Sequence, residues 1–344
     1  MACGRGFDSP RFHHSRPPQG PSRPRKPKGV WGRVFGNFAS VAFVHWFIAP
    51  GPIQALRRRA AAWLLGALLG SLAGCTTPPP SWKGQDEAAG PWQRVAAGLH
   101  YRSFSPWPDS RVHVLRLDLR EPGLRLVVSS PDERGLPMDR RVDGRTALAS
   151  FNASFFDRDF VPRGLTISQG EAWTPLLRVE PSPWLACDAA QRCRMKFTET
   201  EGAPPAEAVN AVAGTPWLVR TGQVRTDADD ARCASFCAAR HPRTAVGLGA
   251  QGRWLLVVLA EGRRPPVAGL TLVQLAQLMR DLGAVDAINL DGGGSSTLWL
   301  QGRAAMARPA NEPAERALAN VVSIVRADAY TDAGADAVTG NTAP

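Results

Sequence analysis

Hydrophobic positions in the second half of the chain follow strand-like and helix-like periods in turn. Two apolar runs, Thr244 to Leu248 and Trp254 to Ala260, flank a short glycine-bounded turn. They predict a hairpin whose nearly continuous second run is typical of a central strand. Thr271 is placed to cap a helix that ends near Gly283, and Val285 to Leu290 predicts another strand. This strand, helix, strand order indicates a sheet with at least one covered face.

Shorter apolar stretches bounded by Gly and Pro occupy the rest of the chain. Arg111 to Leu119 alternates apolar and polar residues, and Leu124 to Val128 continues after a Pro-Gly turn, so the two are predicted to pair as a hairpin. The Pro-rich, cysteine-bearing region from Pro175 to Pro205 is interpreted as an excursion or flap. Further strands are predicted at Thr146 to Phe151, Leu165 to Ser168, Val209 to Val219, Thr297 to Leu300 and Ala319 to Val325.

Together these elements predict a single α+β domain over residues 92–327, with a mixed, largely central β-sheet flanked by helices. A composition of 44% hydrophobic and 21% charged residues excludes a disordered chain. The Ala/Asp/Thr/Gly-rich residues 328–344 are expected to form a flexible tail.

Positive charge is concentrated at the N-terminal end. The chain carries a net charge of +11, of which residues 1–59 supply +10 and the remainder +1. A basic protein commonly binds nucleic acid or an anionic membrane, but here the predicted folded domain has almost no net charge. We therefore expect no nucleic-acid partner for the domain.

The basic segment contains the pattern of an export signal. Arg57 to Arg59 precede an apolar run from Ala60 to Leu72, which is too short to span a bilayer comfortably. Leu72 to Cys75 resembles a bacterial lipobox, in which Cys75 becomes the lipidated N-terminus. Residues 57–75 are therefore interpreted as a lipoprotein signal peptide and residues 76–91 as a tether; a short buried helix is the alternative. The protein is expected to be exported and anchored by lipid to an envelope membrane, facing the periplasm or the cell surface.

Residues 1–56 precede that signal and are interpreted as a non-native or disordered extension. A signal peptide normally begins close to its basic residues, so a mis-assigned start codon explains the extension most simply. An unusually long signal and a basic nucleic-acid-binding arm are the alternatives.

Export changes how the remaining cysteines are interpreted. An oxidising compartment favours disulfides, and the simplest pairing is local, Cys187 with Cys193 and Cys233 with Cys237. Four cysteines allow three connectivities. Zinc binding is the alternative, although the spacings lack a paired CxxC motif.

The strand ending in Asn289-Leu290-Asp291 carries the strongest candidate chemistry. Because side chains in a strand alternate, Asn289 and Asp291 share one face. The following Gly292, Gly293 and Gly294 permit positive φ angles and an array of N–H groups suited to an anion. A carboxylate beside such an array suits acid/base chemistry on an anionic substrate. A tight glycine turn that merely links two strands is the alternative.

Three further polar clusters lie at predicted strand ends. His241-Pro-Arg243-Thr244 offers a guanidinium group that fits phosphate or carboxylate. Asn152 to Asp157 combines an amide, two aromatic rings and a carboxylate, and Glu261-Gly-Arg263 closes the apolar run from Trp254. Taken alone, the first cluster fits a surface arginine in a turn equally well, the second is better explained by packing plus a turn, and the alternative for the third is a solvated strand end.

Taken together, these segments resemble the phosphodiester glycosidase family, from about Tyr101 to Val325. The most specific part runs from Gly269 through the predicted helix to the sequence Asp-Gly-Gly-Gly-Ser-Ser-Thr that ends at Thr297. The chain departs from the family's usual pattern at Ala153-Ser154 and at Glu261, which leaves room for a shifted substrate. The resemblance implies hydrolysis of a sugar 1-phosphodiester in an envelope or extracellular glycan, with release of free sugar and a phosphomonoester.

Roles for individual residues follow from their chemistry. Asp291 and Glu261 are expected to activate water or stabilise an oxocarbenium-like transition state, and Arg243 to stabilise the leaving phosphate. The residues expected to bind substrate are Asn152, His241, Thr244, Asn289, Gly292, Gly293, Gly294, Ser295 and Ser296.

No cofactor is expected to be required. A divalent metal is nevertheless possible, because Asp286, Asn289 and Asp291 are oxygen ligands. The expected partners are an anionic sugar-phosphate substrate and, through Cys75, a membrane. The competing functional class is a non-catalytic envelope lipoprotein that binds anionic glycans through the same turn.

Overall fold

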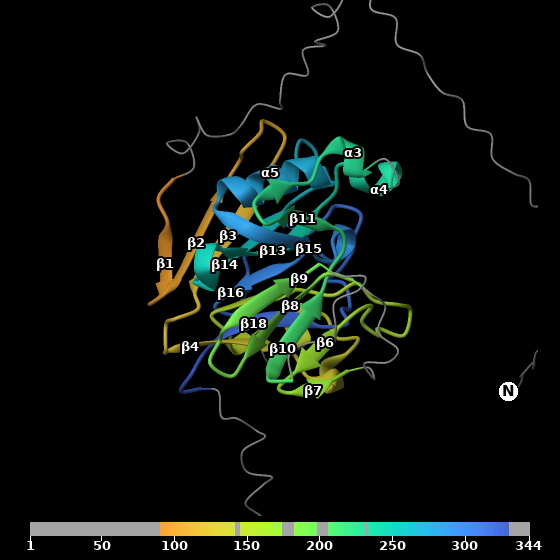
Figure 1. Cartoon of the computed structure of the whole chain (residues 1–344). Helices are drawn as coiled ribbons and strands as arrows, with labels where there is room; N and C mark the ends of the chain where they lie inside the picture. Colours follow the sequence, from red (N-terminus) through yellow and green to blue (C-terminus); the bar gives the residue numbers. More distant parts are fainter. Residues whose placement is uncertain (1–89, 142–144, 174–181, 198–205, 231–232, 330–344) are drawn as a thin grey trace, which may run out of the picture. The chain divides into compact units, whose positions relative to one another are not determined.

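The computed structural model describes residues 90–141, 145–173, 182–197, 206–230 and 233–329 (Figure 1). The predicted extension, signal peptide and lipidated Cys75 lie outside the described residues, as do nearly all of the tether and of the C-terminal tail. The described strands form three antiparallel sheets of eight, five and five strands.

The eight-stranded sheet has the order β1-β2-β3-β14-β13-β15-β11-β12. The predicted hairpin of β13 and β14 is confirmed and lies at its centre, where nearly every residue of both strands is buried. The strands span, in sheet order, Gln93–Ala96, Leu99–Phe104, Val112–Asp118, Trp254–Ala260, Arg243–Gly249, Ala284–Asn289, Trp217–Arg220 and Gln223–Val224.

Helix α5 (Leu272–Asp281) connects β14 to β15 and covers one face of this sheet (Figure 1). Thr271 accepts the Gln274 N–H at 3.1 Å, and the Gln274 side chain accepts the Thr271 N–H at 3.0 Å, so the predicted capping box is present. Gly283 has a φ of +102° at the end of the helix. The predicted strand, helix, strand unit is therefore confirmed.

The opposite face of the large sheet packs against the two smaller sheets, in one shared apolar core. The second sheet has the order β17-β16-β5-β18-β4 and the third has the order β7-β6-β10-β8-β9. The strands of the second span Arg303–Ala304, Leu298–Leu300, Ala149–Asn152, Val321–Arg326 and Leu124–Val128. Those of the third span Glu171–Ala172, Thr166–Ser168, Ala208–Ala213, Trp184–Asp188 and Cys193–Lys196.

The α+β prediction, with one mixed sheet flanked by helices, is wrong because the fold is mainly β. Among the described residues, α5 is the one helix of seven or more residues, and every strand pair is antiparallel. Side chains of a second layer of strands, instead of helices, cover the other face of the large sheet. The remaining helical turns are α3 (Asp227–Asp230), α4 (Ala234–Cys237), η3 (Pro131–Glu133), η4 (Met138–Arg140), η6 (Ala250–Gly252) and η7 (Gly293–Ser295).

The predicted hairpin of residues 111–119 and 124–128 is also wrong. Both strands form, but β3 pairs with β2 and β14, whereas β4 pairs with β18 in the second sheet. The turn between them passes from one sheet to another, and apolar periodicity carries no information about which strand is the partner. Likewise, the predicted flap at 175–205 contains β8 and β9 of the third sheet.

Both predicted disulfides are present. Cys187–Cys193 joins β8 to β9, and Cys233–Cys237 closes a short loop at α4. Of the three possible connectivities, the structure therefore contains the local one.

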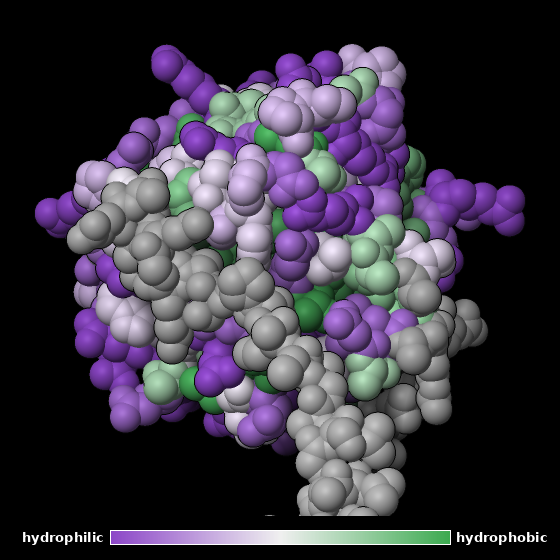
Figure 2. All heavy atoms as spheres, turned by 90° about the horizontal axis from the view of Figure 1, so that it is seen from above, coloured by the Kyte–Doolittle hydropathy of each residue, from purple (hydrophilic) through white to green (hydrophobic). Residues whose placement is uncertain are grey.

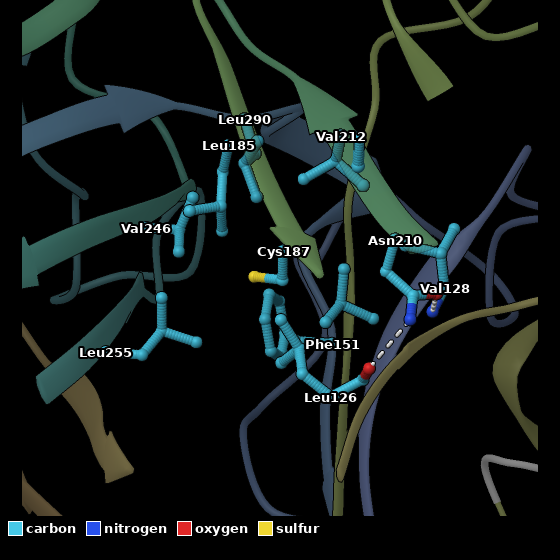
Figure 3. Close-up of a pocket in the computed structure, with 12 residues that line it drawn as sticks. Leu126, Val128, Phe151, Leu185, Cys187, Asn210, Val212, Val246, Leu255 and Leu290 are labelled. Atoms are coloured by element: carbon cyan, nitrogen blue, oxygen red, sulfur yellow. Dashed lines mark hydrogen bonds between the residues drawn. The ribbon is translucent and has the colours of Figure 1, made fainter. Parts of the chain in front are cut away.

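Strand β4 lies at an edge of the second sheet, and side chains of the third sheet satisfy its free backbone groups. Asn210 donates to the carbonyl of Leu126 at 3.0 Å and accepts the N–H of Val128 at 2.9 Å (Figure 3). The side chain of Gln191 accepts the Leu126 N–H at 2.8 Å, and Ser168 donates to the Val128 carbonyl at 2.8 Å. These bonds protect an edge strand and hold the two sheets together.

Asn210→Ala is expected to lower the free energy of unfolding by roughly 2 kcal/mol, because two buried backbone groups of β4 lose their partners. Urea unfolding monitored by circular dichroism measures the change. Ser168→Ala, which removes one bond to the same strand, is the matched control and is expected to cost less. An Asn210→Ala variant as stable as the parent protein would contradict the role of Asn210 at this edge.

The surface above α5 is mainly hydrophilic, with small separate apolar patches (Figure 2). Phe236 on α4 is 40% exposed and is the one exposed large hydrophobic residue in the described ranges. None of the helices in those ranges is long and apolar enough to cross a membrane.

Candidate active site

Three strand ends meet at one edge of the large sheet. Strands β14 and β15 lie on either side of β13 and both run antiparallel to it. Glu261 follows β14, Asp291 lies two residues beyond β15, and His241 precedes β13. Neighbouring strands are about 4.8 Å apart, so the backbones at Glu261 and Asp291 are separated by roughly 10 Å. The fold thus brings three of the predicted clusters to one edge.

Asn152, 1% exposed at the end of β5, joins the second sheet to this edge. Its Nδ2 donates to the carbonyl of Asp291 at 2.7 Å. Its Oδ1 accepts the Thr244 hydroxyl at 2.8 Å and the Thr297 N–H at 3.2 Å. Sequence reasoning predicted that Asn152 and Thr244 bind substrate. In the structure their side chains bond to each other, and Asn152 holds the backbone of Asp291.

The carboxyl group of Asp291 is enclosed by the turn that follows it. Its Oδ1 accepts the Gly292 N–H at 2.9 Å, and the Asp291 N–H donates to the carbonyl of Ala153 at 2.9 Å. Burial raises the pKa of Asp291 to about 6, against the opposing effects of Ser295, the Gly292 amide and the charge of Arg316. A buried carboxyl group that titrates near neutral pH is suited to proton transfer.

The glycines after Asp291 allow other groups to approach the turn closely. A Cβ on Gly292 would lie 2.8 Å from the Pro242 carbonyl oxygen, and Gly293 has a φ of +59°. The Gly293 N–H donates to that same carbonyl at 2.8 Å. With the Gly292 N–H bonded to Asp291, two of the three predicted anion-binding amides already have protein acceptors.

Two guanidinium groups lie against the glycine turn. A Cβ on Gly293 would lie 3.3 Å from Nη2 of Arg263, and one on Gly294 would lie 2.5 Å from Nη2 of Arg316. Arg316 is paired with Glu312. The Asp291 carboxyl group therefore lies in a turn flanked by the exposed Arg263 and by the Arg316–Glu312 ion pair.

Nδ1 of His241 lies 3.2 Å from Nη2 of the Arg263 guanidinium group. Burial lowers the pKa of His241, and the charges of Arg243 and Arg263 lower it further. These effects favour a neutral imidazole beside the turn, which can hydrogen-bond a substrate without adding charge.

Arg243 is 1% exposed and bonds to backbone carbonyls. Its Nε donates to Leu270 at 3.1 Å, and its Nη2 donates to Phe236 at 2.6 Å and Ala239 at 2.9 Å. Its guanidinium carbon lies 4.6 Å from the Phe236 ring centroid. Burial lowers the pKa of Arg243 to about 10, although the charge of Asp230 opposes this. In the structure these donors hold the loop that carries Phe236.

Glu261 belongs to a buried polar chain that spans three strands. Its Oε1 accepts from His113 Nε2 at 2.8 Å and from the Ala307 N–H at 2.9 Å, while His113 Nδ1 accepts from the Tyr101 hydroxyl at 2.8 Å. Burial raises the pKa of Glu261, but the hydrogen bonds from His113 and Ala307 and the charges of His113 and Arg111 together lower it. Glu261 is therefore held as a carboxylate.

Among the predicted binding residues, the buried Asn289 Oδ1 and Ser296 Oγ lack a protein hydrogen-bond partner within the described ranges. The other polar atom of the Asn289 side chain, Nδ2, donates to the Thr215 carbonyl at 2.7 Å. Buried polar atoms are normally paired, so an unpaired acceptor at a strand end suits a substrate hydroxyl.

The three oxygen ligands considered for a metal do not converge. Asp286 accepts the Thr221 N–H at 2.8 Å near the other end of β15, and strand alternation places it on the face opposite Asn289. The one ligand group of three found in the described ranges comprises Asp230, Cys233 and Cys237. There the sulfurs form the disulfide and Asp230 pairs with Arg225.

Several residues of this site escaped sequence reasoning. Arg263 was visible only as a neighbour of Glu261, and the loop with Glu312 and Arg316 carries no recognisable motif. His113 lies within an apolar strand, where it resembles a core residue. Their contacts form between segments far apart in the chain, which no local pattern predicts.

Comparison with known proteins identifies the family. Residues 145–325 match the phosphodiester glycosidase family, and the chain belongs to that family.

The chain is similar to the mouse N-acetylglucosamine-1-phosphodiester alpha-N-acetylglucosaminidase, with 35% identity over 104 residues, which are 27% of this chain and 20% of the mouse protein. It is also similar to the SPbeta prophage-derived protein YomE of Bacillus subtilis, with 31% identity over 128 residues, which are 36% of this chain and 18% of YomE. The matches thus span about a fifth of the curated relatives.

Among solved structures, the fold is similar to the zebrafish N-acetylglucosamine-1-phosphodiester alpha-N-acetylglucosaminidase catalytic domain auto-inhibited by pro-peptide. The TM-score is 0.56 at 21% identity, over 69% of this chain and 86% of the zebrafish chain.

Proposed function

We propose that this protein hydrolyses a sugar 1-phosphodiester at the anomeric carbon, in an envelope or extracellular glycan, and releases a free sugar and a phosphomonoester. The observation that carries the proposal is the partly buried Asp291 carboxyl group, whose pKa is raised to about 6 in a glycine turn flanked by Arg263 and Arg316. A group that titrates near neutral pH, next to cations, suits proton transfer at an anionic substrate. Membership of the phosphodiester glycosidase family supports the same reaction class.

Asp291 acts as the general base in this proposal. Its carboxylate takes a proton from water, the resulting hydroxide attacks the anomeric carbon, and the bond from that carbon to the phosphate oxygen breaks. The phosphomonoester departs with the bonding electrons. Because phosphate is a good leaving group, the reaction needs no strong general acid.

Glu261 is the second carboxylate. Environments that shift the pKa values of two carboxyl groups in opposite directions assign the groups different roles. Burial prevails at Asp291, whereas at Glu261 the hydrogen bonds and nearby charges together outweigh burial. Glu261 stays ionised and stabilises positive charge that develops on the sugar ring in the transition state. His113 and Tyr101 hold its orientation.

Arg263 and Arg316 are the groups that we assign to the substrate phosphate. Both lie against the glycine turn, whereas Nε and Nη2 of Arg243, the arginine predicted for this role, are bonded to three carbonyls. Arg243 supports the site by fixing the loop beside His241. The unpaired Oδ1 of Asn289 is placed to orient a sugar hydroxyl.

Export and lipid attachment at Cys75 are part of the proposal and rest on the signal-peptide pattern alone. A lipid-anchored enzyme at the envelope would meet the glycan phosphodiesters on which this site is proposed to act. Intact-mass analysis of the protein from a native membrane fraction tests the processing, since cleavage before Cys75 removes residues 1–74.

The direct test is turnover with a panel of defined sugar 1-phosphodiesters that vary in the sugar. The expected result is equimolar release of reducing sugar and phosphomonoester from at least one member. Binding without release of either product would favour the competing function, a glycan-binding lipoprotein.

Hydrolysis is expected to depend on pH through Asp291. The base must be ionised, so kcat/KM should be constant well above the pKa of about 6 and fall by about tenfold per pH unit below it. Initial rates between pH 4 and pH 9 at constant ionic strength, with the folded state checked at each pH, measure the profile. A profile that rises as the pH drops through 6 would assign Asp291 the opposite role, as an acid.

A further inference from the structure

A pocket of about 390 Å³ lies between the segment that follows β5 and the segment that follows β10. It is lined by Phe155, Phe156, Arg163, Gly164, Ser182, Gly214 and Thr215. None of these residues was predicted to bind substrate. The volume lies within the range of small-molecule sites.

Two hydrogen bonds tie the walls of the pocket to the proposed active site. The segment after Asn152 bonds to Asp291 through the carbonyl of Ala153 at 2.9 Å and reaches the pocket two residues later, at Phe155. On the other wall, Thr215 accepts a hydrogen bond from Asn289 at 2.7 Å. The pocket therefore lies beside the strand end that carries Asp291.

The floor of the pocket is closely packed. A Cβ on Gly214 would overlap the carbonyl of Asn289, and one on Gly164, where φ is +82°, would overlap Ser182 and Ala213. Both positions therefore require glycine, because side chains there would displace the strand end or fill the pocket.

One wall is a hairpin held by its own hydrogen bonds. The Arg163 N–H donates to the carbonyl of Phe155 at 2.7 Å, and Asp157 Oδ1 accepts the N–H groups of Asp159 and Val161, each at 2.9 Å. The ring of Phe156 stacks on another ring of this hairpin, with centroids 5.4 Å apart. This wall is consequently ordered in advance of any ligand, which lowers the entropic cost of binding.

Arg163 supplies positive charge at the exposed side of the pocket, next to the phenyl rings of this wall. Its side chain is exposed, and its guanidinium group has no hydrogen-bond or ion-pair partner among the described residues. A guanidinium group binds carboxylate or phosphate with paired donors, while the flanking phenyl rings contact the carbon skeleton. A neutral sugar would make no use of the charge.

We propose that this pocket binds the alcohol part of the phosphodiester, beyond the phosphate, and that it selects alcohols that carry a second negative charge through Arg163. The inference rests on the proposed function, because the phosphate itself is assigned to the glycine turn. Phe155 and Phe156 contact the carbon chain that joins the two anionic groups. Arg163 is thus a specificity residue and takes no part in bond cleavage.

The test uses two N-acetylglucosamine 1-phosphodiesters that differ only in the alcohol, methyl or 2-carboxyethyl. The parent protein is expected to show a KM about fivefold lower for the carboxyethyl compound, the magnitude of one exposed ion pair. Arg163→Gln should abolish that preference with little change in kcat for the methyl compound, and Arg163→Lys should keep most of it. Arg158→Gln removes an exposed charge from the same hairpin without reaching the pocket and is the matched control.

Calorimetric titration with both compounds separates this inference from the proposed function. If neither is hydrolysed, the proposed function fails for this sugar, but tighter binding of the carboxyethyl compound that disappears in Arg163→Gln still supports the pocket. Equal binding of the two compounds overturns the inference. So does the absence of binding of either compound at about 10 mM, which is tenfold above a Kd of about 1 mM. A preference for a methyl diester of glucuronic acid 1-phosphate instead would place the sugar in the pocket and equally overturn it.

Discussion

Asp291→Asn is expected to lower kcat/KM by about 10²- to 10⁴-fold, the usual contribution of a positioned general base. Asparagine keeps the shape of the side chain and can still accept the Gly292 N–H, but it cannot take a proton from water. The loss should appear in kcat more than in KM, since in the proposed mechanism the arginines hold the substrate phosphate. Steady-state kinetics on the substrate found in the panel measures the change.

The same substitution should make the protein more stable at neutral pH. The pKa of Asp291 rises from 3.8 to about 6 on folding, so between those values the folded state keeps a proton that the unfolded state has lost. The free energy of unfolding therefore falls as the pH rises through this window. Asparagine does not ionise, so Asp291→Asn should be more stable than the parent by about 2–3 kcal/mol above pH 7 and nearly equal to it at pH 4.

Asp286→Asn on the same strand is the matched control. Asp286 accepts one backbone N–H, that of Thr221, which asparagine can also accept, and it lies near the opposite end of β15 from Asp291. The Asp286→Asn variant should keep the activity of the parent protein and show no such gain in stability. Full turnover by Asp291→Asn would remove Asp291 from the reaction, and equal stability of the two proteins at every pH would contradict its buried ionisation.

Local patterns predicted the part of the fold that carries the site. The hairpin of β13 and β14, the capped helix α5 and the strand β15 follow from periodicity, a capping box and a C-terminal glycine, all of which act within a few residues. Partners between sheets depend on contacts across the core. For this reason β4 was paired with the wrong neighbour, and a second layer of strands was mistaken for covering helices.

The same distinction applies to the site. Asp291 and its glycines are adjacent in sequence and therefore visible as a motif. Whether an arginine is exposed beside the glycine turn or bonded to a set of carbonyls is decided by tertiary packing, as at Arg263 and Arg243. The polar chain from Tyr101 to Glu261 includes a bond between His113 and Glu261, which are 148 positions apart in the sequence. Neither residue stands out from its neighbours in the sequence.

Asn152→Ala is expected to lower the free energy of unfolding by roughly 3–5 kcal/mol, because it leaves three buried partners without their bonds, the Thr244 hydroxyl, the Thr297 N–H and the Asp291 carbonyl. Ser323→Ala, which removes one bond to Ser150 on the same strand, is the control and should cost about 1 kcal/mol. Urea unfolding compares the two.

Asn152→Asp tests whether this residue also tunes the chemistry. The substitution keeps an acceptor for Thr244 and Thr297 but places a second carboxyl group beside the backbone of Asp291. A neighbouring negative charge disfavours ionisation, so the pKa of Asp291 should rise further and the acid limb of the kcat/KM profile should move to higher pH. A purely structural role would lower stability without moving that limb. Because Asn152 bridges the second sheet and the strand end of the first, a displaced limb would show that the ionisation of Asp291 responds to charge at the junction between the sheets.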